Sequence, residues 1–107
     1  MTLQDLMGDR KEDSLTESQL RIAQVFKSMM ELVLEKNRRY GDSALSPKQI
    51  FSKLDSGESI KLRLDDKISR IMNNNGEVRK NDVADIMGYL ALFSVSQNWL
   101  DFSDLID

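Results

Sequence analysis

The chain has 107 residues, of which 40% are hydrophobic, and both values are typical of one globular domain. Fifteen basic and eighteen acidic residues give a net charge of −3, whereas proteins that bind duplex DNA usually carry a basic excess, so we expect no duplex DNA partner. The absence of cysteine and histidine excludes disulfides, thiol nucleophiles and the usual zinc sites, so any metal would be an oxygen-ligated ion such as Mg²⁺.

The hydropathy pattern predicts a cytoplasmic protein with no membrane partner. No apolar run reaches about 18 residues, the length that a membrane-spanning helix requires. No basic segment followed by an apolar stretch and a cleavage site is recognisable near the first residue.

Residues 1–15 predict a flexible or partly helical lead-in, because the segment GDRKEDS is highly charged, and residues 16–107 predict a single helical domain. The first helix should span about 17–40. Thr16 and Gln19 fit a capping box, in which each side chain accepts from the other residue's free backbone N–H. Gly41 lies where a left-handed cap would end the helix. The apolar face of this helix consists of Ile22, Phe26, Met29, Met30 and Val33.

Two shorter helices are expected next. Ser46 is a natural N-cap and Pro47 fits the first helical position, which predicts a helix over about 47–54. A third helix over about 58–73 should end at the sequence NNNG. Its apolar face consists of Ile60, Leu64, Ile68 and Ile71.

The fourth helix, over about 82–98 with Asn81 as its cap, should be the most buried element, because VADIMGYLALFSV is apolar around most of its circumference. We therefore expect an all-α bundle of four main helices. The Met-rich first helix and the fourth helix offer more apolar surface than a small bundle covers, which favours a homo-oligomer.

A basic stripe runs along the third helix. Arg63, Lys67 and Arg70 follow one another at steps of four and three, and Asp66 lies within helical reach of both arginines. One interpretation is a phosphate grip, because guanidinium groups engage phosphate oxygens in pairs. The other is a solvated face with intrahelical ion pairs, which are common and weak.

The fourth helix carries Asp82, Asp85 and Tyr89 at steps of three and four. Asp82 can stabilise the helix N-terminus through the helix dipole. Asp85 lies within an apolar segment, where a carboxylate is buried only with a partner. It should either pair with a basic residue of the third helix or bind something else.

The end of the first helix is a second candidate site. Asn37 and Tyr40 continue its apolar face and should point inward. Tyr40 could stack on a base and Asp42 could accept hydrogen bonds from a base edge or a ribose. The alternative is that the tyrosine fills the end of the bundle and Asp42 fixes the turn.

Glu31 and Glu35 lie on the opposite side of the first helix. Their four-residue spacing is compatible with a metal site, but the helical wheel directs them to solvent.

The segments EKNRRYGDSAL, IFSK, LRLDDKISRI and NDVADIMGYLALF together resemble those of a family of small phage-encoded helical proteins, within about residues 31–95. The chain looks related to the nucleotide-modification-associated domain and, more remotely, is similar to MazG-like all-α nucleotide pyrophosphohydrolases. The resemblance implies a nucleotide ligand in a helical, oligomeric protein. Some small helical phage proteins capture host cyclic-nucleotide signals as oligomeric sponges.

In the MazG group, paired glutamates on one helix and a Glu-x-x-Asp on another hold magnesium on a triphosphate. Asp82-x-x-Asp85 matches the second element with aspartate in the first place, and Glu31 and Glu35 are four residues apart instead of three. By this resemblance, Asp82 and Asp85 are the candidate metal ligands.

Three functions follow as hypotheses. The first is a nucleotide-binding protein that captures a phosphorylated nucleotide, linear or cyclic, and sequesters a host immune signal. The second is a Mg²⁺-dependent nucleoside triphosphate pyrophosphohydrolase, in which Glu35 or Asp66 would join the two aspartates. The third is a structural helical interaction module. No catalytic residue is identified. The residues expected to contact a nucleotide are Asn37, Tyr40, Asp42, Arg63, Asp66, Lys67, Arg70 and Tyr89.

Overall fold

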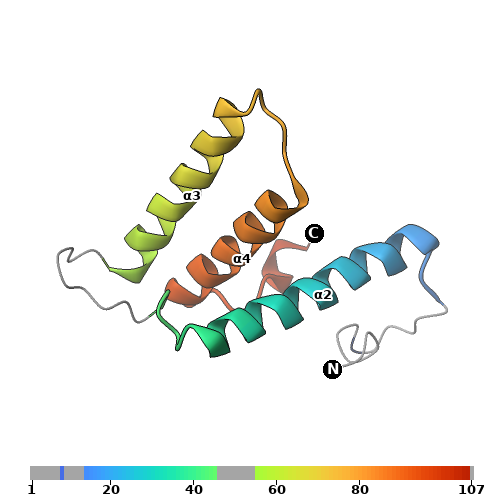
Figure 1. Cartoon of the computed structure of the whole chain (residues 1–107). Coiled ribbons are helices and arrows are strands. Elements are labelled where there is room, and N and C mark those ends of the chain that lie inside the picture. Colours follow the sequence, from blue (N-terminus) through green and yellow to red (C-terminus); the bar gives the residue numbers. More distant parts are fainter. Residues whose placement is uncertain (1–7, 9–13, 46–54, 107) are drawn as a thin grey trace. The chain divides into compact units, whose positions relative to one another are not determined.

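The computed structural model describes residue 8 and residues 14–45 and 55–106 (Figure 1). These residues form three α-helices, which are α2 (Glu17–Arg39), α3 (Ser56–Asn73) and α4 (Lys80–Ser96), and a short 3₁₀-helix, η2 (Ser103–Leu105). No strand occurs in the described part of the chain. The all-α prediction is therefore confirmed. The helix predicted over 47–54 lies outside the described residues, so a four-helix bundle stays a prediction.

Contacts within the chain define two compact units, Met1–Lys36 and Asn37–Asp107. Among the described residues, no helix combines the length and the apolar character that crossing a membrane requires.

The predicted caps of α2 are confirmed. The Thr16 backbone N–H donates to Gln19 Oε1 at 3.0 Å, and the Gln19 N–H donates to Thr16 Oγ1 at 3.2 Å. At the other end, Gly41 has a φ of +59°. The N–H of Asp42 donates to the carbonyl of Asn37 at 3.2 Å, which is the six-residue bond of a Schellman motif. Local capping chemistry therefore sets both ends of this helix.

The apolar face of α2 contains no buried residue, and Ile22 and Phe26 are more than half exposed. The prediction that Tyr40 points inward is wrong, because its exposed fraction is 67%. Helical spacing identifies which side chains share a face, but it does not determine what covers that face.

The start of α3 lies two residues before its predicted start. Asp55 is the N-cap, and its Oδ1 accepts from the Glu58 N–H at 2.8 Å. The chain leaves α3 through Asn75 and Gly76, whose φ angles are +58° and +77°. The Gly76 N–H donates to the Ile71 carbonyl at 3.0 Å, so this end is also a Schellman motif.

The start of α4 differs from the prediction as well. Arg79, not Asn81, is the N-cap residue, and its backbone N–H donates to Asp82 Oδ2 at 2.9 Å. The carboxylate three residues into the helix thus supplies the capping interaction that we had expected from the asparagine.

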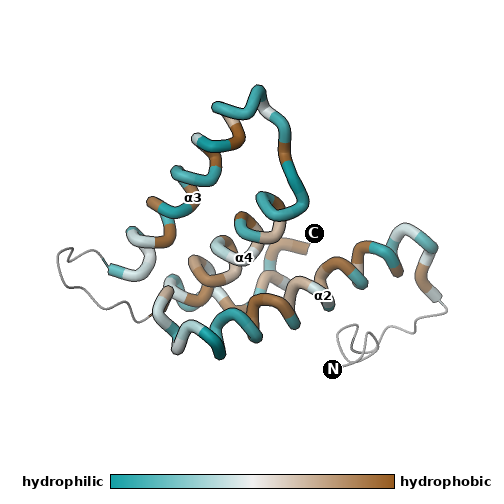
Figure 2. Tube along the Cα trace, in the orientation of Figure 1, coloured by the Kyte–Doolittle hydropathy of each residue, from teal (hydrophilic) through white to brown (hydrophobic). Residues whose placement is uncertain are grey.

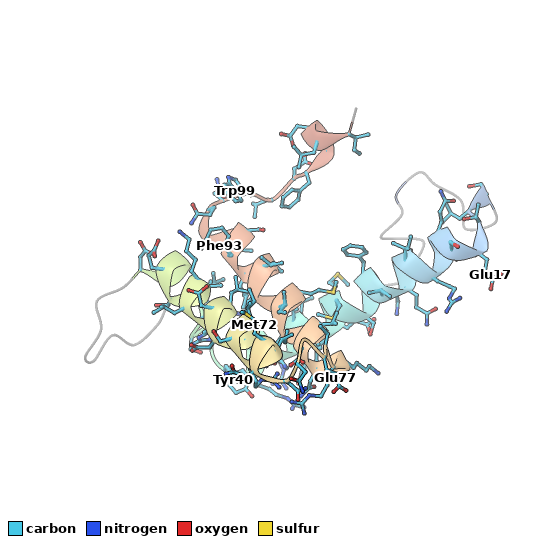
Figure 3. The ribbon with its side chains drawn as sticks, turned by 90° about the horizontal axis from the view of Figure 1, so that it is seen from above. Glu17, Tyr40, Met72, Glu77, Phe93 and Trp99 are labelled. Atoms are coloured by element: carbon cyan, nitrogen blue, oxygen red, sulfur yellow. The ribbon has the colours of Figure 1, made fainter. Side chains whose placement is uncertain are left out.

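The helices α3 and α4 contact each other and are joined by the short segment 74–79 (Figure 1). Ile60 and Gly57 of α3 are buried. A Cβ atom added at Gly57 would lie 3.0 Å from Gln97 Nε2, so the absence of a side chain allows this close approach. Phe93 and Trp99 pack edge to face with their ring centroids 5.9 Å apart (Figure 3).

The prediction that α4 is the most buried helix is confirmed among the described helices, because α4 has the largest share of buried and half-buried residues. Most of α4 is apolar (Figure 2), but its one buried residue is Asp82. Val83, Leu90 and Val95 remain 46–49% exposed. An apolar circumference shows which side chains a helix is able to bury. In the described chain α3 covers only one side of α4, so apolar side chains on its other sides stay exposed.

Candidate functional site: an ion-paired pocket between two helices

A shallow, open pocket of about 230 Å³ lies between α3 and α4. It is lined by Arg63, Asp66, Lys67, Arg70 and Tyr89. All five lining residues belong to the predicted nucleotide-contacting set. Sites that enclose a whole small-molecule ligand usually measure about 300–1,000 Å³, so this pocket suits one group of a ligand, such as a phosphate or a sugar.

The α-helical conformation of α3 brings its lining residues together. Arg63, Lys67 and Arg70 recur every three or four residues and therefore lie on one side of the helix, with Asp66 among them. The α4 helix contributes Tyr89, which adds an aromatic ring and a hydroxyl group to a wall that is otherwise charged.

Two of the three cations already have partners on α4. The Arg70 guanidinium donates through Nη2 to Asp82 Oδ1. Lys67 Nζ lies 2.6 Å from Asp85 Oδ2 and 3.8 Å from Asp82 Oδ1. Asp85 thus pairs with a basic residue of the third helix, which was one of the two alternatives that the sequence left open.

Burial explains why these pairs form. The exposed fraction of Asp82 is 1%, and that of the Asp85 side chain is 24%. A carboxylate removed from water is tolerated only with charged or hydrogen-bonding partners. Asp82 has such partners at both oxygens, because Oδ1 faces Arg70 and Lys67 and Oδ2 accepts from the Arg79 N–H. The basic stripe of α3 therefore forms ion pairs with α4, through Lys67 and Arg70, instead of ion pairs within its own helix.

The two predicted metal ligands, Asp82 and Asp85, both face cations in this arrangement. In the described part of the chain, no group of three or more acidic side chains is placed to hold a metal ion. The geometry therefore does not favour metal binding at these aspartates, and their role as ligands stays a prediction.

Glu31 lies at the surface, as the helical wheel predicted. Its Oε1 accepts from Lys27 Nζ at 2.9 Å, and its side chain is 55% exposed. The hydrogen bond from Lys27 and the positive charge of the same group lower the pKa of Glu31.

The predicted site at the end of α2 does not contribute to the lining of the pocket. Asn37 Nδ2 donates to Asp42 Oδ1 at 2.7 Å, and Asp42 has a φ of +63°. Asp42 therefore stabilises the turn, which was the structural alternative. Tyr40 neither fills a bundle end nor lines the pocket, since it is 67% exposed. Ligand contacts by these three residues stay a prediction.

Comparisons with models of known protein families, with curated proteins and with solved structures find no match to this chain. The resemblance to the nucleotide-modification-associated domain and to MazG-like enzymes therefore stays a prediction.

Proposed function

We propose that this protein binds a nucleotide and that the pocket between α3 and α4 holds its phosphate-bearing part. The observation that carries the proposal is the convergence of Arg63, Lys67 and Arg70 on one pocket that also contains Tyr89. Guanidinium and ammonium groups are the usual protein ligands of phosphate. The tyrosine offers a ring against which a base or sugar can pack and a hydroxyl group that can hydrogen-bond to it.

Arg63 is the cation best placed for a phosphate. Among the described residues it has no ion pair, whereas Lys67 and Arg70 are held by aspartates of α4. A phosphate can engage Arg63 without displacing a carboxylate. Arg70 is 42% exposed and has further N–H donors besides the one directed at Asp82.

The proposed activity is capture without turnover. The pocket presents three cations, and the described residues offer no cluster of carboxylates suited to holding Mg²⁺ on a triphosphate. Sequestration of a host signal, as in some small helical phage proteins, is the biological role that we propose, and it requires that the ligand be recovered unchanged.

Isothermal calorimetry with AMP, GMP, cyclic AMP and ATP tests this proposal. At least one of them should bind more tightly than about 1 mM. Arg63→Ala should weaken that binding about tenfold or more, because a hydrogen bond to a charged group contributes about 1.5–3 kcal/mol. Arg21→Ala is the matched control, since Arg21 is an exposed arginine of α2 outside the pocket.

The proposal fails if none of the four nucleotides binds. It also fails if Arg63→Ala and Arg21→Ala have the same effect, because the heat would then report association elsewhere. Recovery of a monophosphate and pyrophosphate from ATP would support the hydrolase alternative instead.

A second candidate function, a helical module that associates with itself, is favoured by a separate observation. Large apolar side chains are exposed on α4 and on the segment that follows it, namely Val83, Leu90, Val95, Trp99, Leu100, Phe102, Leu105 and Ile106. Analytical ultracentrifugation would test this candidate. Leu90→Glu should shift a homo-oligomer to monomer, whereas a wild-type protein that sediments as a monomer would exclude self-association.

A further inference from the structure

The charges in and beside the pocket balance. Arg63, Lys67 and Arg70 contribute three positive charges. Three aspartates contribute three negative charges: Asp66 lines the pocket, and Asp82 and Asp85 form ion pairs with Lys67 and Arg70. The formal charge of this cluster is zero. A site that accumulates cations to hold a triphosphate would have a positive excess, since phosphate groups attract Lys and Arg through their charge.

The carboxylates of α4 are not free to leave. Asp82 is 1% exposed and has a partner at each of its two oxygens, one of which caps α4. Asp85 lies 2.6 Å from Lys67 Nζ. A ligand with several negative charges would have to compete with these aspartates for Lys67 and Arg70, and it would also be repelled by them.

Two charged lining residues have no ion pair in the described part of the chain, the cation Arg63 and the carboxylate Asp66. They are three residues apart on α3 and border the same pocket. The positive charge of Arg63 attracts a negatively charged group of the ligand. Asp66 accepts hydrogen bonds and therefore calls for a donor, such as a hydroxyl or an amino group.

We propose that the pocket selects a ligand with a single negative charge that also donates a hydrogen bond, namely a phosphodiester nucleotide. The diester oxygens contact Arg63, and a sugar hydroxyl or base amino group donates to Asp66. This inference rests on the proposed nucleotide-binding function and specifies its ligand class. Asp66 acts as the discriminating residue, because its carboxylate repels each additional negative charge on the ligand.

A charge series measured on the full-length protein tests the inference. The probes are cyclic AMP, with one negative charge, AMP, with about two at neutral pH, and ATP, with still more. All three carry the same base and are measured by calorimetry at constant ionic strength without divalent cations. Cyclic AMP should bind most tightly, and ATP should bind about tenfold or more weakly than cyclic AMP.

The variant Asp66→Asn distinguishes selection by the charge of Asp66 from selection by the shape of the pocket. The amide keeps the size of the side chain and removes its charge, so the preference for cyclic AMP over ATP should shrink to about threefold or less. Asp104→Asn is the matched control, because it removes an exposed aspartate of η2 outside the pocket, and it should leave the preference unchanged. Thermal melts of each variant confirm that the fold is intact.

The possible outcomes are distinguishable. Tightest binding of ATP to the wild-type protein would overturn this inference and leave the proposed nucleotide-binding function standing. A preference for cyclic AMP that survives Asp66→Asn would show selection by shape and would overturn the role assigned to Asp66. Binding of none of the three probes would overturn the inference, and the proposed function would fail with it only if GMP also does not bind.

Discussion

Replacing Asp82, which lies beside the pocket, with asparagine should destabilise the fold more than a conservative change at any residue that lines the pocket. Asp82→Asn keeps the size of the side chain and an oxygen that can accept from the Arg79 N–H. It removes the negative charge that faces Arg70 and Lys67. Because Asp82 is 1% exposed, water cannot replace the lost interaction at the aspartate itself.

The expected loss is about 3 kcal/mol in the free energy of unfolding. Removing one partner of a buried ion pair typically costs about 3–5 kcal/mol. The lower end applies because Arg70 is 42% exposed, so water can solvate its guanidinium, and because Lys67 keeps its contact with Asp85. For a chain of this size, the loss corresponds to a fall in Tm of roughly 12–18 °C.

Circular dichroism at helical wavelengths, recorded during heating and during urea titration, measures this loss. Asp66→Asn is the matched control, because Asp66 is exposed and has no ion pair among the described residues, and it should change stability by about 0.5 kcal/mol or less. Combining Asp82→Asn with Arg70→Met should reveal a coupling of about 1–2 kcal/mol between the two sites. Equal stability of Asp82→Asn and Asp66→Asn would show that the buried ion pair of Asp82 does not stabilise the fold.

Three further predictions concern local structure. Thr16→Ala should destabilise α2 by about 1 kcal/mol by removing the acceptor of the Gln19 N–H, as measured by urea unfolding. Gly76→Ala should lower the free energy of unfolding by about 1 kcal/mol, because Gly76 has a φ of +77° and the space around it is open, so backbone strain is the only cost. An unchanged midpoint of urea unfolding would contradict this prediction. Lys27→Met should raise the pKa of Glu31 toward its ordinary value in an NMR titration, because Lys27 is what lowers it. The stabilisation from this pair should therefore be present above the unfolded-state pKa of Glu31 and be lost as the pH falls through its lower folded-state pKa.

The sequence predicts elements well where their ends depend on neighbouring residues. The bounds of α2 are correct within one residue, because the Thr16–Gln19 box and Gly41 are local signals. The start of α4 was misplaced because two capping candidates lie next to each other. Asn81 is a residue type that commonly caps helices, but the observed capping hydrogen bond runs from the Arg79 N–H to Asp82 Oδ2.

The residues that line the pocket could be predicted from the sequence, but the ion pairs between α3 and α4 could not. Helical spacing alone placed Arg63, Lys67 and Arg70 on one face, and all five lining residues were among the predicted set. That Arg70 pairs with Asp82 depends on the contact between α3 and α4, which the spacing within one helix does not determine. The short connection between the two helices was a usable signal, because it brings the end of α3 close to the start of α4.

Burial was the least predictable property. The apolar faces of α2 and α4 are clear from the sequence, but Phe26, Tyr40 and Leu90 are largely exposed. Periodicity determines which residues share a face. What covers the face depends on the arrangement of whole elements, and a single helical pattern carries no information about that arrangement.

An NMR titration of isotope-labelled wild-type protein with cyclic AMP tests directly whether the pocket between α3 and α4 holds the nucleotide. We predict that the largest shifts occur at residues that line the pocket, including the side-chain N–H groups of Arg63 and Arg70 and the backbone of Tyr89. Spectra that do not change, or shifts confined to α2 and the turn at Tyr40, would contradict the assignment of the nucleotide site to the pocket between α3 and α4.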